Sequence, residues 1–141
     1  MSPFFLTKNK SEIMEKQPDI IISKADLMEL ENQLERSKLP IEFICALEQE
    51  LDRATIVSSK DLPEDVVALG SQVTFKILDT QKTFTKTLCL PADTIKFDDS
   101  ISVFAPIGAA LIGLQTGQCI KWQTQRGLQS VEIVNVKGKV Q

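Results

Sequence analysis

Two stretches near the start of the chain repeat apolar residues at helical spacing. In the first, Leu27, Leu30 and Leu34 recur every three or four residues, which predicts a helix with one apolar face. Ser23 stands before this stretch and Asp26 follows three residues later, an acidic variant of the capping box that begins a helix. The second stretch repeats the spacing at Ile44, Leu47, Leu51 and Ala54. The pattern therefore predicts two amphipathic helices.

A short break separates these two helices. It contains Ser37, Lys38, Leu39 and Pro40. The proline cannot continue the first helix but suits the first turn of the second. Helices joined by so short a break are most easily antiparallel neighbours, so we expect residues 20–57 to form a short coiled-coil hairpin. Each helix would have about 14 residues and be about 21 Å long. Residues 20–22 would be an edge strand or an apolar lead-in to the first helix.

After residue 58 the apolar pattern changes from helical to alternating. Val73, Phe75 and Ile77 alternate with polar residues, as in a half-buried strand. Further strands are expected at residues 84–90, 101–104, 118–124 and 128–136, with a short helix at 107–112 that Gly113 closes. We therefore predict an α+β fold, in which the helical hairpin precedes an antiparallel sheet with one short helix over residues 58–141. Residues 1–19 are weakly patterned and are expected to be a tail.

The charge of the chain is concentrated in the predicted hairpin. The chain carries a net charge of −3, and its residues 23–54 hold four basic and eight acidic side chains. This balance argues against a protein that holds nucleic acid by neutralising phosphates. Along the first helix, Asp26, Glu29, Glu31 and Glu35 are expected to point away from the apolar stripe, as on a solvated helix exterior.

The residue types limit the available chemistry. The chain has no histidine, which excludes Ser-His-Asp triads and imidazole acid–base catalysis. Cys45, Cys89 and Cys119 lack metal-ligand spacing and are expected to be small buried hydrophobes. We expect no cofactor and no bound metal. No apolar stretch approaches the length of about 20 residues that spans a bilayer, so we expect a cytoplasmic protein without a membrane partner.

The sequence of residues 101–113, ISVFAPIGAALIG, resembles the central motif of the Gre factors, bacterial transcript-cleavage factors whose C-terminal domain is FKBP-like. Gly117, Trp122, Gly127 and the final strand at 131–136 continue the likeness. The N-terminal part is similar to the Rnk branch of this fold family, which has a shortened coiled coil. Residues 39–41, 46–47, 50–54 and 63–67 carry that similarity.

The resemblance implies bacterial RNA polymerase as the partner. In Gre factors the FKBP-like domain grips the rim of the secondary channel while the coiled coil enters it. An Asp-x-x-Glu pair at the hairpin tip of cleavage factors helps to hold a second Mg²⁺ for RNA hydrolysis.

The hairpin tip of this chain departs from that pattern. It consists of Ser37, Lys38, Leu39, Pro40 and Glu42, which is one base and one acid. Lys38 opposes a cation, and Glu42 suits the first turn of a helix. The resemblance therefore implies a regulator that is not an enzyme, which occupies the channel and competes with cleavage factors without stimulating cleavage.

The rim contact is expected just before the short helix. Phe104, Ala105 and Pro106 stand where Gre factors carry an Asp-Ser-Pro-type docking loop, and Ile107 follows them. The resemblance implies that these four residues contact the polymerase. Core packing of Phe104 and Ile107 is the alternative, and exposure of Phe104 would favour an interface.

Three other functions stay open. The chain could be an active cleavage factor with its acidic pair elsewhere. It could be a prolyl isomerase, although that pocket needs an aromatic lining and the chain has no tyrosine and one tryptophan, Trp122. It could also be an interaction module for a target other than the polymerase, without sequence-specific binding to nucleic acid.

Overall fold

The computed structural model describes residues 18–124 and 127–139, of which residues 122–124 and 139 are described by their backbone alone. The predicted tail, residues 1–19, therefore falls outside the described part except for Pro18 and Asp19. The Trp122 ring also lies outside it.

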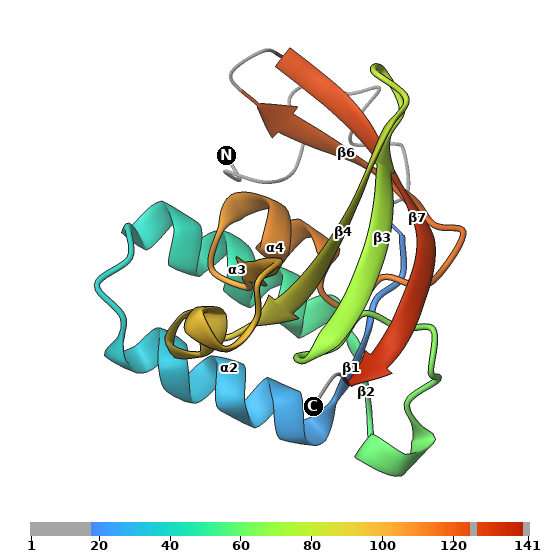
Figure 1. The fold of residues 1–141 in the computed structure, drawn as a ribbon. Coiled ribbons are helices and arrows are strands. Elements are labelled where there is room, and N and C mark those ends of the chain that lie inside the picture. Colours follow the sequence, from blue (N-terminus) through green and yellow to red (C-terminus); the bar gives the residue numbers. More distant parts are fainter. Residues whose placement is uncertain (1–17, 125–126, 140–141) are drawn as a thin grey trace.

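The two predicted helices are present as α2 (Lys24–Arg36) and α3 (Ile41–Arg53). Each has 13 residues and is therefore about 20 Å long. The helices run in opposite directions, and the loop that joins them lies at the edge of the molecule, away from the strands (Figure 1). The hydroxyl of Ser23 accepts a hydrogen bond from the backbone N–H of Asp26 at 3.1 Å, which confirms the predicted cap.

The hairpin helices bury one face each. The buried apolar residues are Leu30 and Leu34 of α2 and Phe43, Ala46, Leu47 and Leu51 of α3. Phe43 was not among the predicted core residues, because it precedes the stripe that begins at Ile44. Two acidic residues, Asp26 and Glu50, are also buried.

Five strands form the main sheet, in the order β5-β4-β3-β7-β6. They are β3 (Ser71–Ile77), β4 (Lys82–Cys89), β5 (Ser100–Ser102), β6 (Cys119–Thr124) and β7 (Gly127–Lys139). β5 pairs with β4 in parallel, so the sheet is mixed and the prediction of an antiparallel sheet was wrong at this edge. The reason is the connection, since the chain between the two strands crosses back through a 3₁₀ helix, η2 (Pro91–Lys96), instead of turning as a hairpin.

A second, two-stranded sheet joins the ends of the hairpin. β1 (Ile21–Ser23) pairs in parallel with β2 (Thr55–Val57), and a 3₁₀ helix, η1 (Ser59–Asp61), follows. Both interpretations of the apolar run before α2 therefore hold, because β1 is a strand and leads directly into the helix.

The short helix α4 (Pro106–Leu111) lies very close to strand β5. A Cβ atom at Gly108 would lie 2.0 Å from the backbone oxygen of Ser102, so only glycine fits there. Gly113 follows the helix with φ +83°, a conformation that glycine adopts without strain, as the sequence predicted.

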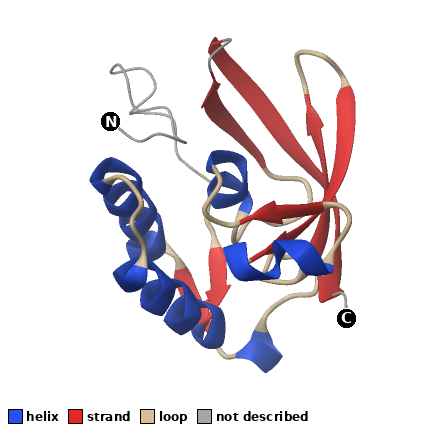
Figure 2. Cartoon of the chain, turned by 60° about the vertical axis from the view of Figure 1, so that its left-hand side comes forward, coloured by secondary structure: helices blue, strands red, loops and turns tan. Residues whose placement is uncertain are grey.

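The hairpin, α4 and the sheet share one apolar core. α2, α3 and α4 lie on the same side of the five-stranded sheet (Figures 1 and 2). Of the three cysteines, Cys89 is buried as predicted, whereas Cys45 and Cys119 are exposed, because their side chains lie on the solvent faces of α3 and β6. No described helix is both long enough and apolar enough to cross a membrane.

Candidate functional site

The structure brings the hairpin tip and the segment before α4 to opposite walls of one groove with a volume of about 630 Å³. Three predicted tip residues and two predicted rim residues line it. The complete lining is Gln33, Arg36, Ser37, Lys38, Leu39, Pro91, Ser102, Phe104 and Ala105. The two sequence regions that were predicted as separate contact sites are therefore neighbours in space.

The tip wall is ordered by local contacts. The Ser37 hydroxyl donates a hydrogen bond to the backbone oxygen of Leu34 at 2.9 Å, which ends α2. Leu39 packs half-buried against the core, whereas Lys38 is exposed. Glu42 is exposed in the first turn of α3, where the helix dipole favours a carboxylate.

The opposite wall is a turn that leads into α4. The backbone N–H of Phe104 donates to the Ser102 hydroxyl at 3.0 Å, and the N–H of Ala105 donates to the Ser102 carbonyl at 3.0 Å. Pro106 begins the helix and is exposed. The Phe104 ring meets the edge of Phe43 at 6.5 Å between centroids and 87° between planes. Phe104 therefore contacts the core and remains partly accessible in the groove.

Ile107 belongs to a second hollow, of about 350 Å³, on the sheet side of α4. Its lining is Phe75, Ile77, Thr80, Lys82, Phe84, Lys86, Ile101, Ile107 and Gln129. Phe75 and Phe84 stack at 5.7 Å, and Phe84 is 39% exposed. Sequence reasoning missed this pocket, although the alternation of Lys82, Phe84 and Lys86 along β4 was a signal of it. The pocket offers an apolar floor with two lysines beside it.

Asp26 fixes the base of the hairpin to the sheet region. Its carboxylate accepts a hydrogen bond from the backbone N–H of Leu69 at 3.1 Å, and Asp26 is 6% exposed. The prediction that Asp26 points to solvent was therefore wrong, because a backbone donor far along the chain uses it as an acceptor. The N–H of Ile21 donates to the Gly113 carbonyl at 3.0 Å nearby.

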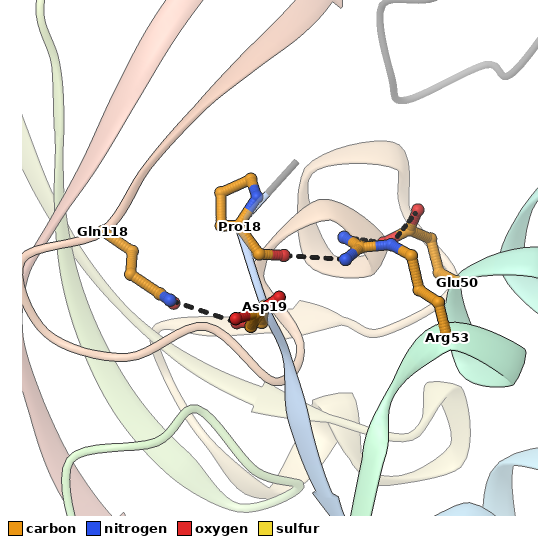
Figure 3. Close-up of polar contacts among 5 residues, drawn as sticks. All are labelled: Pro18, Asp19, Glu50, Arg53 and Gln118. Atoms are coloured by element: carbon orange, nitrogen blue, oxygen red, sulfur yellow. Dashed lines mark hydrogen bonds and ion pairs between the residues drawn. The ribbon is translucent and has the colours of Figure 1, made fainter. Parts of the chain in front are cut away.

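Arg53, at the end of α3, makes a further anchor (Figure 3). Its guanidinium binds the Glu50 carboxylate through two hydrogen bonds of 3.0 and 2.7 Å and donates a third, of 2.8 Å, to the Pro18 carbonyl. On the other side of this segment the Gln118 amide donates to the Asp19 carbonyl at 3.1 Å. These contacts tie the start of the described chain to both the hairpin and the residue that precedes β6.

The site contains little that could hold a metal. Within residues 18–124 and 127–139, no group of three or more Cys, Asp or Glu side chains is placed to bind an ion. Glu42 is the one acid among residues 37–42. What the geometry offers is two hollows on either side of the segment 104–107, a groove that combines Arg36 and Lys38 with apolar side chains and an apolar pocket.

Comparison with known proteins identifies the family. The family model "Transcription elongation factor, GreA/GreB, C-term" matches residues 62–138. The chain is 38% identical over 115 residues to the "Regulator of nucleoside diphosphate kinase" of Escherichia coli K12, covering 79% of this chain and 83% of that protein. It is 32% identical over 96 residues to transcription elongation factor GreA of Chloroherpeton thalassium, covering 68% of this chain and 61% of that protein.

A solved structure agrees with these relatives. The transcription elongation factor GreA/GreB from Nitrosomonas europaea has a TM-score of 0.69 and 37% sequence identity, covering 86% of this chain and 99% of that one. The chain therefore belongs to the GreA/GreB family of transcription elongation factors. Both resemblances stated from the sequence, to the Gre factors and to the Rnk branch, are confirmed.

Proposed function

We propose that the protein binds bacterial RNA polymerase at its secondary channel and obstructs that channel without stimulating transcript cleavage. The observation that carries this proposal is the hairpin tip, which is short and has no acidic pair. Residues 37–42 contain Glu42 as the sole acid and Lys38 as a neighbouring base. One carboxylate beside an ammonium group is a poor ligand for Mg²⁺, which cleavage would require.

The reach of the hairpin supports the same proposal. Helices of 13 residues extend about 20 Å. Part of that length lies against the rest of the molecule, because Phe43 contacts Phe104 in the turn before α4 and the apolar faces of both helices join the shared core. A hairpin of this kind would fill the entrance of a channel and stop short of a distant active site.

The segment 104–107 and the pocket beside it supply the proposed grip on the channel rim. Ile107 and Phe84 face an apolar pocket, and Lys82 and Lys86 stand next to it. Partly exposed aromatic residues in a pocket are the usual anchors of a protein interface. The rim of the polymerase would place an apolar side chain there.

The acidic hairpin would assist association. Residues 23–54 carry a net charge of −4, which attracts the hairpin toward basic channel walls. Steering of this kind raises the association rate more than the final affinity, and salt screens it. Binding should therefore be faster at low ionic strength.

The test is binding together with cleavage. The purified chain is mixed with core polymerase at low salt, and it is then added with Mg²⁺ to backtracked elongation complexes. We expect binding without transcript shortening beyond the polymerase's own rate. Failure to bind would overturn the proposal. Additional shortened transcripts would instead assign the chain to the active cleavage factors.

A further inference from the structure

The groove between the hairpin tip and the segment 102–105 has two chemically different walls. One wall carries Arg36 and Lys38 together with polar side chains of the tip. The other is mainly apolar and is formed around Phe104 and Pro91. None of the residues that line the groove is acidic, although the chain is acidic overall.

The two cations of the groove have no acidic partner within the described part of the chain. Ion pairs there join Arg53 to Glu50 and Lys96 to Asp93, and neither involves Arg36 or Lys38. Arg36 and Lys38 are both exposed. The helix dipole stabilises the positive charge of Arg36 in the last turn of α2 without occupying its guanidinium, and Lys38 lies beyond the end of the helix. Both charges are therefore available to a partner.

The walls are held in place before any partner arrives. Hydrogen bonds from Ser37 to Leu34 and from Phe104 to Ser102 fix the two backbone turns. The edge contact with Phe43 fixes the Phe104 ring across the groove. A preformed site avoids part of the entropy cost of ordering on binding.

We infer that this groove binds a segment of a protein partner in which a carboxylate neighbours an apolar side chain. The inference rests on the proposed function and deepens it, since the partner segment would belong to the polymerase. The carboxylate would meet Arg36 and Lys38, and the apolar side chain would lie against Phe104 and Leu39. Arg binds carboxylates in a two-pronged geometry, which would orient the segment. The volume of about 630 Å³ is enough for a few side chains.

A phosphate ligand fits the groove less well. A nucleoside triphosphate carries about four negative charges at neutral pH, and the hairpin around the groove carries a net charge of −4. Repulsion grows with ligand charge, so a single carboxylate is disfavoured far less. The apolar wall would also leave phosphate oxygens without donors on one side.

The experiment compares charge reversals inside and outside the groove. The groove variant is Arg36→Glu with Lys38→Glu, and the control is Lys24→Glu with Lys60→Glu, which are exposed residues outside the groove lining. Both double variants change the net charge by the same amount. The dissociation constant for nucleic-acid-free core polymerase is measured at low and at moderate salt, with urea unfolding as a check on folding. We expect the groove variant to bind about tenfold more weakly than the control variant.

A variant without charge at positions 36 and 38, and binding tests with ATP and with RNA, distinguish the possible results. Arg36→Gln with Lys38→Gln should weaken binding about fivefold and reduce its salt dependence. Equal binding by the groove and control variants, with wild-type chain still bound to polymerase, would overturn the inference and leave the proposed function standing. Failure of the wild-type chain to bind would remove both. Binding of ATP or a single-stranded RNA oligonucleotide to the free protein, lost in the groove variant, would overturn the protein-segment assignment.

Discussion

Asp26 illustrates how one residue serves two parts of the fold. Its backbone N–H completes the cap of α2, and its carboxylate accepts from the N–H of Leu69. The first role could be predicted, because cap residues lie three positions apart in the sequence. The second could not, because the donor is 43 positions away and only the tertiary fold brings it near.

Replacing Asp26 by alanine tests this anchor. The N–H of Leu69 would lose its acceptor, so the free energy of unfolding should fall by about 1–3 kcal/mol. Asp26→Asn keeps an oxygen acceptor and should lose less. Urea unfolding measures the effect, with Glu31→Ala on the exposed face of α2 as the control. Equal losses for Asp26→Ala and Glu31→Ala would contradict the anchoring role.

The three cysteines should differ in reactivity. Burial, and then the negative charge of Asp93, raises the pKa of the Cys89 thiol, so it carries less thiolate at neutral pH. Loss of water around the sulfur and the charge of Glu132 also raise the pKa of Cys119. In folded protein we expect Cys45 to react first with N-ethylmaleimide and Cys89 last, as mass spectrometry would record. Labelling of Cys89 before Cys45 would contradict its buried position.

At the scale of elements, the packing of α4 on β5 depends on the close approach of Gly108 to the Ser102 carbonyl. Gly108→Ala would place a methyl group against the Ser102 carbonyl, a backbone atom that cannot move aside without shifting β5. We expect a loss of about 3 kcal/mol in the free energy of unfolding, or failure to fold. Gly138→Ala in β7 is the control, because nothing lies within 4 Å of its added Cβ. A Gly108→Ala variant as stable as the control would contradict the packing of α4 on β5.

Strand β4 contributes Phe84 to the pocket of the proposed rim contact. Phe84→Ala should raise the dissociation constant for core polymerase about tenfold, because the variant removes the exposed aromatic wall of the apolar pocket. Leu128→Ala is a matched control, since Leu128 is also 39% exposed but does not line the pocket. Fluorescence anisotropy with labelled chain measures both constants. Equal effects of the two substitutions would argue against docking at this pocket.

Most helices and strands could be predicted because the spacing of their apolar residues can be seen within a short stretch of sequence. The cap at Ser23, the two helices and the strand at residues 73–77 follow from spacing alone. The parallel pairing of β5 could not be predicted, because strand direction depends on how η2 returns the chain rather than on the apolar pattern. Of the groove lining, the sequence singled out Ser37, Lys38, Leu39, Phe104 and Ala105, whose role in binding stays a prediction. It did not single out Arg36 and Pro91, which join the groove only through the docking of the hairpin.

At the scale of the molecule, the hairpin and the sheet act as one body. Apolar faces of α2 and α3 enter the same core as α4, and Arg53 and Asp26 anchor the hairpin base at two points. The tip is therefore held beside the segment 104–107. In the proposed function, this arrangement lets the hairpin cover the entrance of the channel instead of reaching deep inside it.

Competition against a GreA protein tests the central claim most directly. Backtracked elongation complexes are incubated with a fixed amount of GreA and increasing amounts of this chain, and the cleaved RNA is quantified. The account predicts that cleavage falls toward the polymerase's own rate as the chain displaces GreA. Cleavage that stays constant at saturating concentrations of the chain, or that rises with them, would contradict it.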